Sequence, residues 1–275
     1  MTDAATDPDL APGFVKIDDP EDPRIAAYRD IRERDLVGRE ESFIAEGAVV
    51  LDVLLRRSAY RPRSMLVADN RIETARRLLA GTTPAFPVYA ANRTVMDAVA
   101  GFPLHRGMLA HGHRGPLPDW RSLLPPAGRP ARIAVLVGLA NHDNVGGIFR
   151  NAAAFGADAV LLDPTSCDPF YRKAIRVSVG GSLMVPFARF ADTAELVEGL
   201  RSARIEPLAL TPAGTQTLSA MPPPARAAVF LGAEGPGLPA DVLARMTTVR
   251  IPIADRFDSL NVATTSGIVL HHLTA

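Results

Sequence analysis

The apolar positions of this 275-residue chain follow two periods in turn. Short continuous apolar runs are typical of buried strands, and they alternate with segments in which apolar residues recur every three or four positions, as on one face of a helix. In the first part of the chain, the predicted strands are 42–47, 63–68, 86–90 and 107–110, and the predicted helices are 23–36, 48–57, 72–79 and 94–100. This alternation predicts a small α/β domain.

The second part of the chain opens with a continuous apolar run at residues 133–139, typical of a strand buried on both faces of a parallel sheet. Further strands are predicted at 159–162, 185–190, 207–210 and 228–231, and helices at 145–155, 170–179, 193–203 and 239–246. This order of elements predicts a doubly wound, mostly parallel sheet. In such sheets, ligands bind beyond the carboxyl ends of the strands.

Composition divides the chain into segments. Residues 1–20 hold few large apolar side chains and several acidic ones, so we expect a mobile acidic tail. Residues 113–130 are rich in proline and glycine, so we expect a semi-rigid linker there. The expected domains are therefore 21–112 and 131–275.

The segment 251–270 mixes apolar and small polar residues in an unusual way. We expect it to begin as a short apolar strand, to pass through a polar loop, and to enter a helix whose N-cap is Ser259. The first half of that helix carries small polar residues: Asn261, Thr264, Thr265, Ser266 and Gly267. A helix that only fills a core does not need them, so we expect its N-terminal end to border a binding site.

Two earlier loops also follow predicted strands. One leads through Asn144 to Arg150, and the other is a glycine-rich run that contains Gly232 and Glu234. Neither loop has the G-x-G-x-x-G fingerprint or the lysine pattern of a P-loop, so a Rossmann-type nucleotide enzyme is disfavoured. Spacing alone does not decide whether Arg150 is a solvated surface arginine or a functional one.

The three segments together resemble a known family. They read Asn144…Arg150-Asn-Ala-Ala…Gly156-Ala, then Phe230-Leu-Gly-Ala-Glu-Gly-Pro-Gly237, then Ile251-Pro-Ile…Ser259-Leu-Asn-Val262…Gly267-Ile. They are similar to the three motifs of the SpoU (TrmH-type) RNA ribose 2′-O-methyltransferases of the SPOUT superfamily. The resemblance covers residues 131–275. It extends more loosely to 43–47 and 105–110, which resemble the small ribosomal-protein-like substrate-binding domain of that family.

The resemblance implies an α/β fold whose C-terminal, mostly parallel sheet carries a trefoil-knotted site for S-adenosylmethionine, preceded by the small α/β substrate-binding domain. It implies transfer of a methyl group to a ribose 2′-hydroxyl of rRNA or tRNA by a homodimer. Four positions match the family's cofactor site: Thr211, Gly232, Ile251 and Leu260. Five match its catalytic site: Asn144, Arg150, Glu234, Ser259 and Asn261.

Arg150 matches the arginine that the family uses to activate the 2′-hydroxyl. Arginine stays protonated, with a pKa above about 12, so we expect phosphate anchoring and electrostatic activation rather than a literal base role. The sequence departs from the family pattern at two places. Ala263 stands where a serine is common, and His142-Asp143 stands where Asp-Pro is more usual. Neither departure changes a residue assigned to the chemistry.

The net charge of zero hides an asymmetry. Residues 1–22 hold seven acidic residues and one lysine, which leaves 29 basic and 23 acidic residues in the remainder. Nearly all the basic residues are arginines, which bind phosphate bidentately. Two clusters are candidate RNA contacts: Arg56, Arg57, Arg61 and Arg63 in the first domain, and Arg172, Lys173 and Arg176 in the second. A solvated helix end remains the alternative for the first cluster.

Other features of the sequence exclude several classes of protein. No apolar run approaches the ~18 residues of a membrane span, and the N-terminus lacks the layout of a signal peptide. Cys167 is the only cysteine, so no internal disulfide can form. These features favour the cytoplasm. His111 and His113 lack further spaced ligands, so no metal requirement is expected. The remaining alternative is a non-catalytic RNA-binding relative that keeps the fold.

Overall fold

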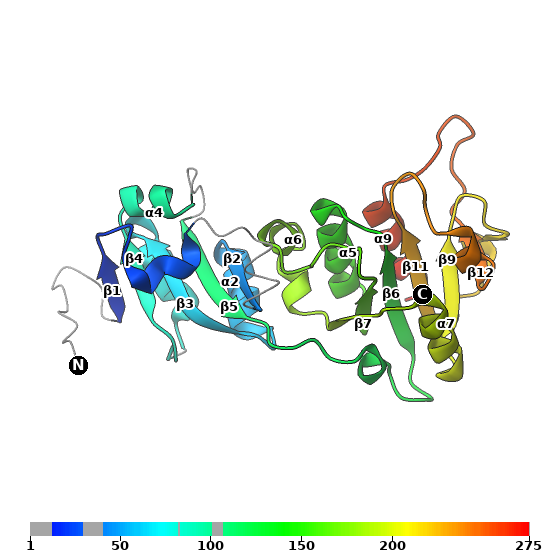
Figure 1. Ribbon diagram of the computed structural model, residues 1–275, viewed down its shortest axis with the longest axis horizontal. Helices are drawn as coiled ribbons and strands as arrows, with labels where there is room; N and C mark the ends of the chain where they lie inside the picture. The colour runs from blue at the N-terminus through cyan, green and yellow to red at the C-terminus, as the bar shows by residue number, and fades with distance from the viewer. Residues whose placement is uncertain (1–12, 30–40, 82, 101–106, 275) are drawn as a thin grey trace. The chain divides into compact units, whose positions relative to one another are not determined.

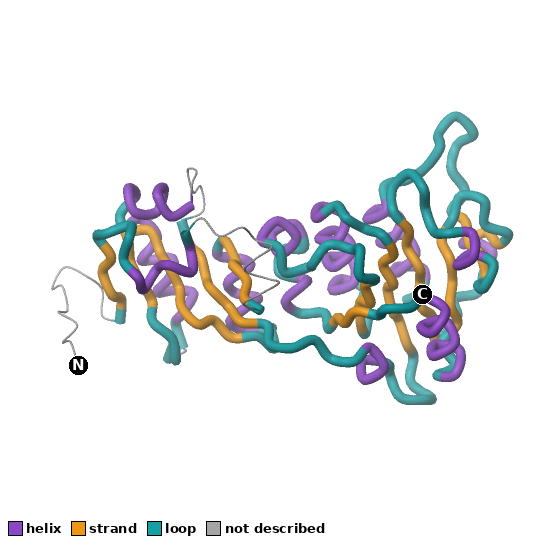
Figure 2. Tube along the Cα trace, viewed as in Figure 1, coloured by secondary structure: helices purple, strands orange, loops and turns teal. Residues whose placement is uncertain are grey.

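The computed structural model describes residues 13–29, 41–81, 83–100 and 107–274. The chain divides into two compact units (Figure 1). Unit 1 comprises residues 1–115 and 170–172, and unit 2 comprises residues 116–169 and 173–275. Each unit contains one sheet with its own helices, drawn in orange and purple in Figure 2.

Unit 1 is built on a mixed sheet with the strand order β1-β4-β3-β5-β2. The strands are β1 (Phe14–Ile17), β2 (Ser42–Glu46), β3 (Arg61–Ala68), β4 (Val88–Ala91) and β5 (Met108–His113). Strands β1 and β3 run parallel to β4, whereas β5 is antiparallel to both β3 and β2. The helices are η1 (Pro23–Tyr28), α2 (Ala48–Arg56), η2 (Asp69–Arg71), α3 (Ile72–Leu79) and α4 (Arg93–Ala100).

Strand β1 corrects the prediction for the N-terminal segment. Phe14–Ile17 pairs in parallel with β4, and the side chain of Ile17 is fully buried. The expectation of a mobile tail over 1–20 is therefore wrong for these residues, while residues 1–12 lie outside the described chain. The predicted helix 23–36 is described only as the 3-10 helix Pro23–Tyr28, because residues 30–40 also lie outside.

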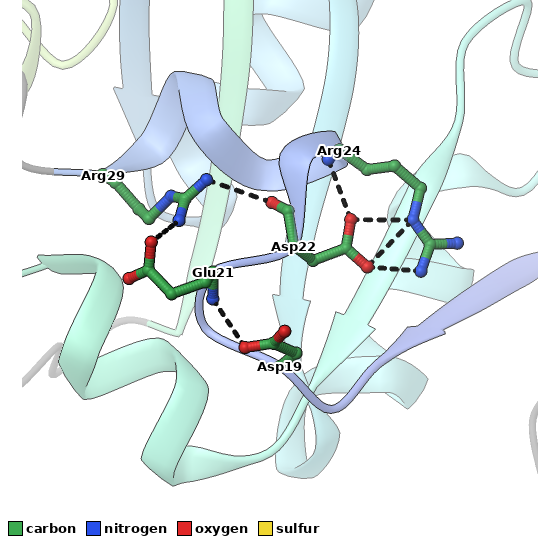
Figure 3. Close-up of polar contacts among 5 residues, drawn as sticks. All are labelled: Asp19, Glu21, Asp22, Arg24 and Arg29. Carbon is green, nitrogen blue, oxygen red and sulfur yellow. Dashed lines mark hydrogen bonds and ion pairs between the residues drawn. The ribbon is translucent and has the colours of Figure 1, made fainter.

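Charged side chains fix the turn between β1 and η1 (Figure 3). The carboxylate of Asp22 caps η1 by accepting the backbone N–H of Arg24 at 2.8 Å, and it also binds the Arg24 guanidinium. These hydrogen bonds hold the pKa of Asp22 below its ordinary value. Arg29 donates to Glu21 and to the carbonyl of Asp22. The acidic residues at 21 and 22 therefore help to fold unit 1.

Unit 2 is built on a fully parallel sheet with the strand order β10-β12-β9-β11-β6-β7-β8. The strands are β6 (Ala131–Val137), β7 (Ala159–Leu162), β8 (Phe187–Arg189), β9 (Glu206–Leu210), β10 (Gln216–Thr217), β11 (Arg226–Gly232) and β12 (Thr247–Arg250). The helices are η3 (Trp120–Leu123), α5 (His142–Ala154), α6 (Arg172–Val177), η4 (Gly181–Leu183), α7 (Thr193–Ser202), η5 (Leu218–Ala220), α8 (Ala240–Leu243) and α9 (Val262–His272).

Alternate residues of these strands face opposite layers of helices. Ile133 and Val135 of β6 share a core with Leu196 of α7, Val242 of α8 and Trp120 of η3. Helices α5 and α9 pack on each other and contact β7 and β11 respectively. The sheet is therefore doubly wound, and the predicted α/β class with a mostly parallel C-terminal sheet is confirmed.

The proline-rich stretch packs on unit 2. Trp120 is only 5% exposed, and its ring fills the space that a side chain at Gly199 of α7 would need. The guanidinium of Arg226 donates to the backbone carbonyls of Pro125, Pro126 and Arg129. Residues 116–130 thus belong to the folded body of unit 2 and do not form a free spacer.

The C-terminal segment crosses back over the sheet. Strand β12 lies one position from the sheet's edge, whereas α9 packs on α5 and on the central strand β11. Residues 251–261 connect the two, and Asn261 contacts the loop after β11 through Glu234. The C-terminal segment thus returns from the edge side of the sheet to its middle.

Candidate functional site

The site lies where three neighbouring strands of unit 2 end. Ala209 of β9 pairs with both Phe230 of β11 and Thr248 of β12, so the three strands finish at the same level. Because parallel strands gather their carboxyl ends at one edge, the loops that follow them meet there. They enclose a cavity of about 620 Å³. Its lining residues are Leu210, Thr211, Pro212, Leu231, Gly232, Ala233, Glu234, Gly235, Gly237, Val249, Ile251, Ile253, Asp258, Ser259, Leu260, Asn261, Val262 and Thr265.

All four predicted cofactor positions line this cavity: Thr211, Gly232, Ile251 and Leu260. Gly232 has a steric requirement of its own. A Cβ there would lie 2.4 Å from the carbonyl carbon of Gly237, and Ala233 and Gly237 form a β-bridge that closes the loop. The backbone N–H of Thr211 donates to the carbonyl of Val249 at 3.0 Å, which joins the loop after β9 to β12. The cavity wall is therefore largely backbone and apolar side chains.

A polar network adjoins the cavity and is centred on Asn261. The side-chain oxygen of Asn261 accepts the backbone N–H groups of Ala263 and Thr264, at 2.9 and 3.2 Å. Its amide nitrogen donates to Asn144 Oδ1 at 2.8 Å and to Glu234 Oε1 at 3.3 Å. Asn261 thus joins three separate elements of unit 2. The predicted catalytic residues Asn144, Glu234 and Asn261 are brought together.

The same contacts correct the predicted start of the last helix. Asn261 is the N-cap of α9, which begins at Val262, so the predictions of a strand at 251 and a cap at Ser259 are wrong. The strand lies earlier, at Thr247–Arg250. Asparagine and serine cap helices about equally well, so composition could not separate Ser259 from Asn261. Ser259 instead lines the cavity from the connecting loop.

Asn144 presents a donor that the described chain does not use. The residue is only 4% exposed, and its oxygen faces the donor of Asn261, whose orientation is fixed by the cap. The Asn144 Nδ2 atom is therefore directed elsewhere, and among the described residues it has no hydrogen-bond partner. Leaving a buried donor unpaired costs about 1–3 kcal/mol. An unpaired buried donor of this kind is typical of a binding site, where a bound ligand accepts the hydrogen bond.

Arg150 lies apart from this network. It follows Asn144 by six residues, which places it about 9 Å further along α5 and about 120° around the helix. Its side chain is exposed, and it is absent from the cavity lining. Within one chain, the structure brings together Asn144, Glu234, Ser259 and Asn261, but it does not bring Arg150 to them.

The small residues of α9 have two different environments. Asn261 and Thr265 line the cavity, as expected for the start of this segment. Ala263 and Ser266 instead meet α5, where the amide of Asn151 donates to the Ala263 carbonyl at 2.7 Å and to Ser266 Oγ at 2.9 Å. A Cβ at Gly147 would lie 2.7 Å from that of Ala263. This close approach explains why position 147 is glycine.

Several residues at the cavity were not predicted as site residues. Leu231, Val249 and Asp258 line the cavity, and Asn151 fixes α9 against α5. The rule that ligands bind beyond strand ends could have found Leu231. Val249 could not be found, because β12 was not recognised: its sequence Thr-Thr-Val-Arg lacks an apolar run.

The arginines predicted to contact RNA in unit 1 are exposed, and two of them also donate hydrogen bonds within the chain. Arg56 donates to Asp52 at 2.8 Å and to the Leu78 carbonyl at 3.0 Å, and Arg61 donates to the Ser58 carbonyl at 2.8 Å. Arg57, which follows α2, and Arg63 of β3 lie on the surface. A guanidinium that already binds one carbonyl keeps other donors for phosphate.

The second predicted cluster is divided between the units. Arg172 groups with unit 1 and pairs with the buried carboxylate of Glu46 at 3.0 Å, which is a structural ion pair. Lys173 and Arg176 are exposed on unit 2, and Lys173 pairs with Asp143 at 2.6 Å. Burial and the nearby Lys173 charge lower the pKa of His142, the first residue of α5.

Two features are absent from the described residues. No group of three or more His, Cys, Asp or Glu side chains is arranged to hold a metal ion in the ranges that the structure describes. None of the described helices is both long and apolar enough to cross a membrane.

Comparison with known proteins identifies the family. The family model described as "SpoU rRNA Methylase family" matches residues 131–271, which contain the whole cavity and its polar network. The chain belongs to the SpoU rRNA methylase family. An uncharacterized tRNA/rRNA methyltransferase of Mycobacterium tuberculosis is 39% identical over 267 residues, which cover 93% of this chain and 90% of that relative.

Solved structures of RNA methyltransferases have the same fold over nearly the whole chain. An rRNA methyltransferase from Sinorhizobium meliloti, solved with bound AdoMet, matches with a TM-score of 0.77 at 23% identity, over 95% of this chain and 97% of that one. An RNA 2′-O ribose methyltransferase matches with a TM-score of 0.75 at 23% identity, over 94% and 98% of the two chains. The two-unit architecture is therefore shared with these proteins.

Proposed function

We propose that this member of the SpoU family transfers a methyl group from S-adenosylmethionine to a ribose 2′-hydroxyl of rRNA or tRNA. The observation that carries the proposal is the cavity at the ends of β9, β11 and β12. Thr211, Gly232, Ile251 and Leu260 line it, and the network of Asn144, Glu234 and Asn261 adjoins it. The similar structures with bound AdoMet and with ribose 2′-O activity support the same assignment.

The cavity suits an adenosine and a sulfonium group. Its volume of about 620 Å³ falls within the ~300–1,000 Å³ of typical small-molecule sites. Leu231, Ile251 and Leu260 offer apolar surface for a flat purine, and the peptide groups around Gly232 offer backbone donors and acceptors. Asp258 and Glu234 add carboxylates, which complement a positively charged ligand. The donor set therefore fits S-adenosylmethionine.

The cofactor, when bound, supplies an electrophilic methyl group on a sulfonium. The 2′-hydroxyl is a weak nucleophile, so the chain's own residues have to hold it in line and assist loss of its proton. We assign the positioning to Ser259 and to the network around Asn261, which is rigid because its acceptor caps α9. The unpaired Nδ2 of Asn144 is a donor for an oxygen of the substrate.

Arg150 completes the proposed catalytic set by a different route. Its exposed guanidinium is available to bind a phosphate of the RNA and to stabilise negative charge on the attacking oxygen. In this role Arg150 does not take up the proton of the hydroxyl, which passes to a substrate phosphate or to solvent. Because Arg150 lies outside the cavity lining, this role requires that the RNA extend over the surface of α5.

RNA contacts outside the cavity are assigned to exposed basic residues. In unit 1 these are Arg56, Arg57, Arg61 and Arg63, and in unit 2 they are Lys173 and Arg176. Arg172 contributes mainly through its ion pair with Glu46. We further propose a homodimer, because Met184 and Ile268 of unit 2 are 40% and 39% exposed and a subunit interface would cover them. Light scattering of the purified protein tests the oligomeric state.

Labelled methyl transfer from S-adenosylmethionine to total rRNA and tRNA tests the proposed function. The proposal predicts incorporation into RNA, together with S-adenosylmethionine binding in calorimetry. Cofactor and RNA binding without any incorporation would favour the non-catalytic RNA-binding alternative. Absence of cofactor binding would show that the cavity is not a site for S-adenosylmethionine.

A further inference from the structure

One exposed aromatic side chain stands beside the cavity. Phe257 is 67% exposed, more than any other large apolar side chain in the described residues. A single exposed apolar residue is common on protein surfaces and needs no explanation by itself. The position of Phe257 is what sets it apart.

Phe257 lies at the tip of the loop that forms one wall of the cavity. Ile251 and Ile253 line the cavity before the tip, and Asp258 and Ser259 line it after the tip. The tip is closed by a hydrogen bond from the Phe257 N–H to the Ala254 carbonyl at 2.9 Å. In Figure 1 the loop between β12 and α9 projects beyond the ends of the strands. Asp258 lines the cavity and directly follows Phe257, so the Cα of Phe257 lies only about 3.8 Å from that of a lining residue.

The charges around Phe257 indicate which part of a nucleotide it would meet. Arg256 precedes it, but Asp255 and Asp258 flank the pair, so the tip has a net negative charge. A negative tip does not attract the phosphate backbone. Aromatic rings bind RNA bases by stacking, which needs no positive charge and tolerates any base.

The proposed reaction leaves the base without an assigned position. Methyl transfer to the 2′-oxygen requires the ribose at the cavity mouth, while the base attached to it has to be held elsewhere. An exposed ring within about two residues of the cavity lining is suited to that purpose.

On the basis of the function proposed above, we propose that Phe257 is a stacking platform for the base of the methylated nucleotide or of its immediate neighbour. The ring fixes the base outside the cavity and thereby orients the ribose. Phe257 is in this sense a positioning residue for the RNA, and it does not contact the reacting atoms.

Kinetics of Phe257 variants test the proposal. Phe257→Ala is expected to raise the KM for RNA by about 5- to 100-fold, the range that base–aromatic stacking supplies, with the Kd for S-adenosylmethionine unchanged. Phe257→Tyr and Phe257→Trp should retain the KM, whereas Phe257→Leu should resemble Phe257→Ala because it lacks a π-face. Val49→Ala is the matched control, since Val49 is similarly exposed at 63% on α2.

A spectroscopic experiment reports stacking without relying on turnover. Trp120 is the only native tryptophan and is buried, so Phe257→Trp adds one exposed indole. Titration with total rRNA or tRNA should quench the added fluorescence, measured as the difference from the wild-type protein. Quenching is expected because a stacked base contacts the indole directly.

Several outcomes would overturn the proposal. An unchanged KM in Phe257→Ala, full activity in Phe257→Leu, or an unquenched indole signal in a Phe257→Trp enzyme that methylates RNA would each exclude stacking. A weaker Kd for S-adenosylmethionine would make Phe257 part of the cofactor site, and a change in molecular mass would make it a contact between copies of the chain. Failure of the proposed function is distinct, because the wild-type protein would then methylate no RNA.

Discussion

Helix α9 and the loop at residues 251–261 are consecutive in the chain, yet they are built differently. The helix is held tightly against α5, with Gly147 beneath Ala263 and with Asn151 bonded to the Ala263 carbonyl and to Ser266. The loop is largely exposed, and its backbone is closed by one described hydrogen bond, between Phe257 and Ala254. Asn261 stands at the junction of the two.

The difference separates two tasks within one segment. The α5–α9 contact fixes the position of the polar network, which has to be rigid if it is to orient a reacting group. The loop has few buried contacts, so it can adjust to a cofactor and to RNA. Substitutions in the loop and around the cavity should therefore change ligand binding, and substitutions in the α5–α9 contact should change stability.

The largest expected effect comes from adding a side chain at Gly232 in the wall of the cavity. In Gly232→Ala the new Cβ would collide with the backbone of Gly237 and Leu238, which cannot move without breaking the loop. We expect a stability loss of about 1–3 kcal/mol and a roughly 100-fold weaker Kd for S-adenosylmethionine, measured by calorimetry. Gly156→Ala is the control: its positive φ makes alanine costly to the fold, but the new Cβ meets no atom, so the Kd should stay unchanged.

Removing Arg150 should impair the reaction with RNA and leave cofactor binding intact. In Arg150→Ala we expect methyl transfer to fall by at least about 100-fold, because a charge that stabilises the transition state is lost. The Kd for S-adenosylmethionine should stay nearly unchanged, because Arg150 does not line the cavity. Single-turnover transfer measures the first effect. Retained turnover in this variant would remove Arg150 from its proposed role.

Substitutions at Asn261 separate its two roles, as the N-cap of α9 and as the centre of the polar network. Asn261→Ala removes both, and we expect a stability loss of about 1–2 kcal/mol together with reduced transfer. Asn261→Ser keeps an acceptor for the cap, but its single, shorter O–H cannot replace the amide group that donates to both Asn144 and Glu234. It should regain most of the stability and little of the activity. Equal recovery of both would mean that Asn261 acts only as a cap.

The smallest expected effect on activity comes from the helix contact. Asn151→Ala loses two hydrogen bonds to α9 and should lower the free energy of unfolding by about 1–3 kcal/mol in urea titrations. At temperatures where the variant is folded, its kcat should match the wild type. A large fall in kcat would show that the helix contact and the reaction are coupled.

Much of the fold could be predicted from periodicity, because buried parallel strands such as Ala159–Leu162 read as uninterrupted apolar runs. Strands at the sheet's edge side carried no such signal: Thr247–Arg250 and Gln216–Thr217 are polar sequences that pair only because neighbouring strands offer them partners. Strand Phe14–Ile17 was not predicted, because the acidic residues around it made the whole N-terminal segment look like a polar tail.

The candidate site was reached through the motif resemblance rather than through spacing. That resemblance named Thr211, Gly232, Ile251 and Leu260, and the ends of three adjacent strands bring them to one cavity. The sequence could not predict that Asn261 rather than Ser259 caps α9, because the point where a helix begins depends on tertiary contacts. The six-residue spacing of Asn144 and Arg150, in contrast, already places the two about 120° apart around one helix.

Identification of the methylated nucleoside tests the central claim most directly. RNA labelled by the protein with radioactive S-adenosylmethionine is digested with alkali, which cleaves the chain only where a free 2′-hydroxyl can attack the neighbouring phosphate. If the protein methylates the ribose 2′-oxygen, the label appears in alkali-resistant dinucleotides, which yield a 2′-O-methyl nucleoside on further digestion. Label recovered in mononucleotides with a methylated base would contradict the claim.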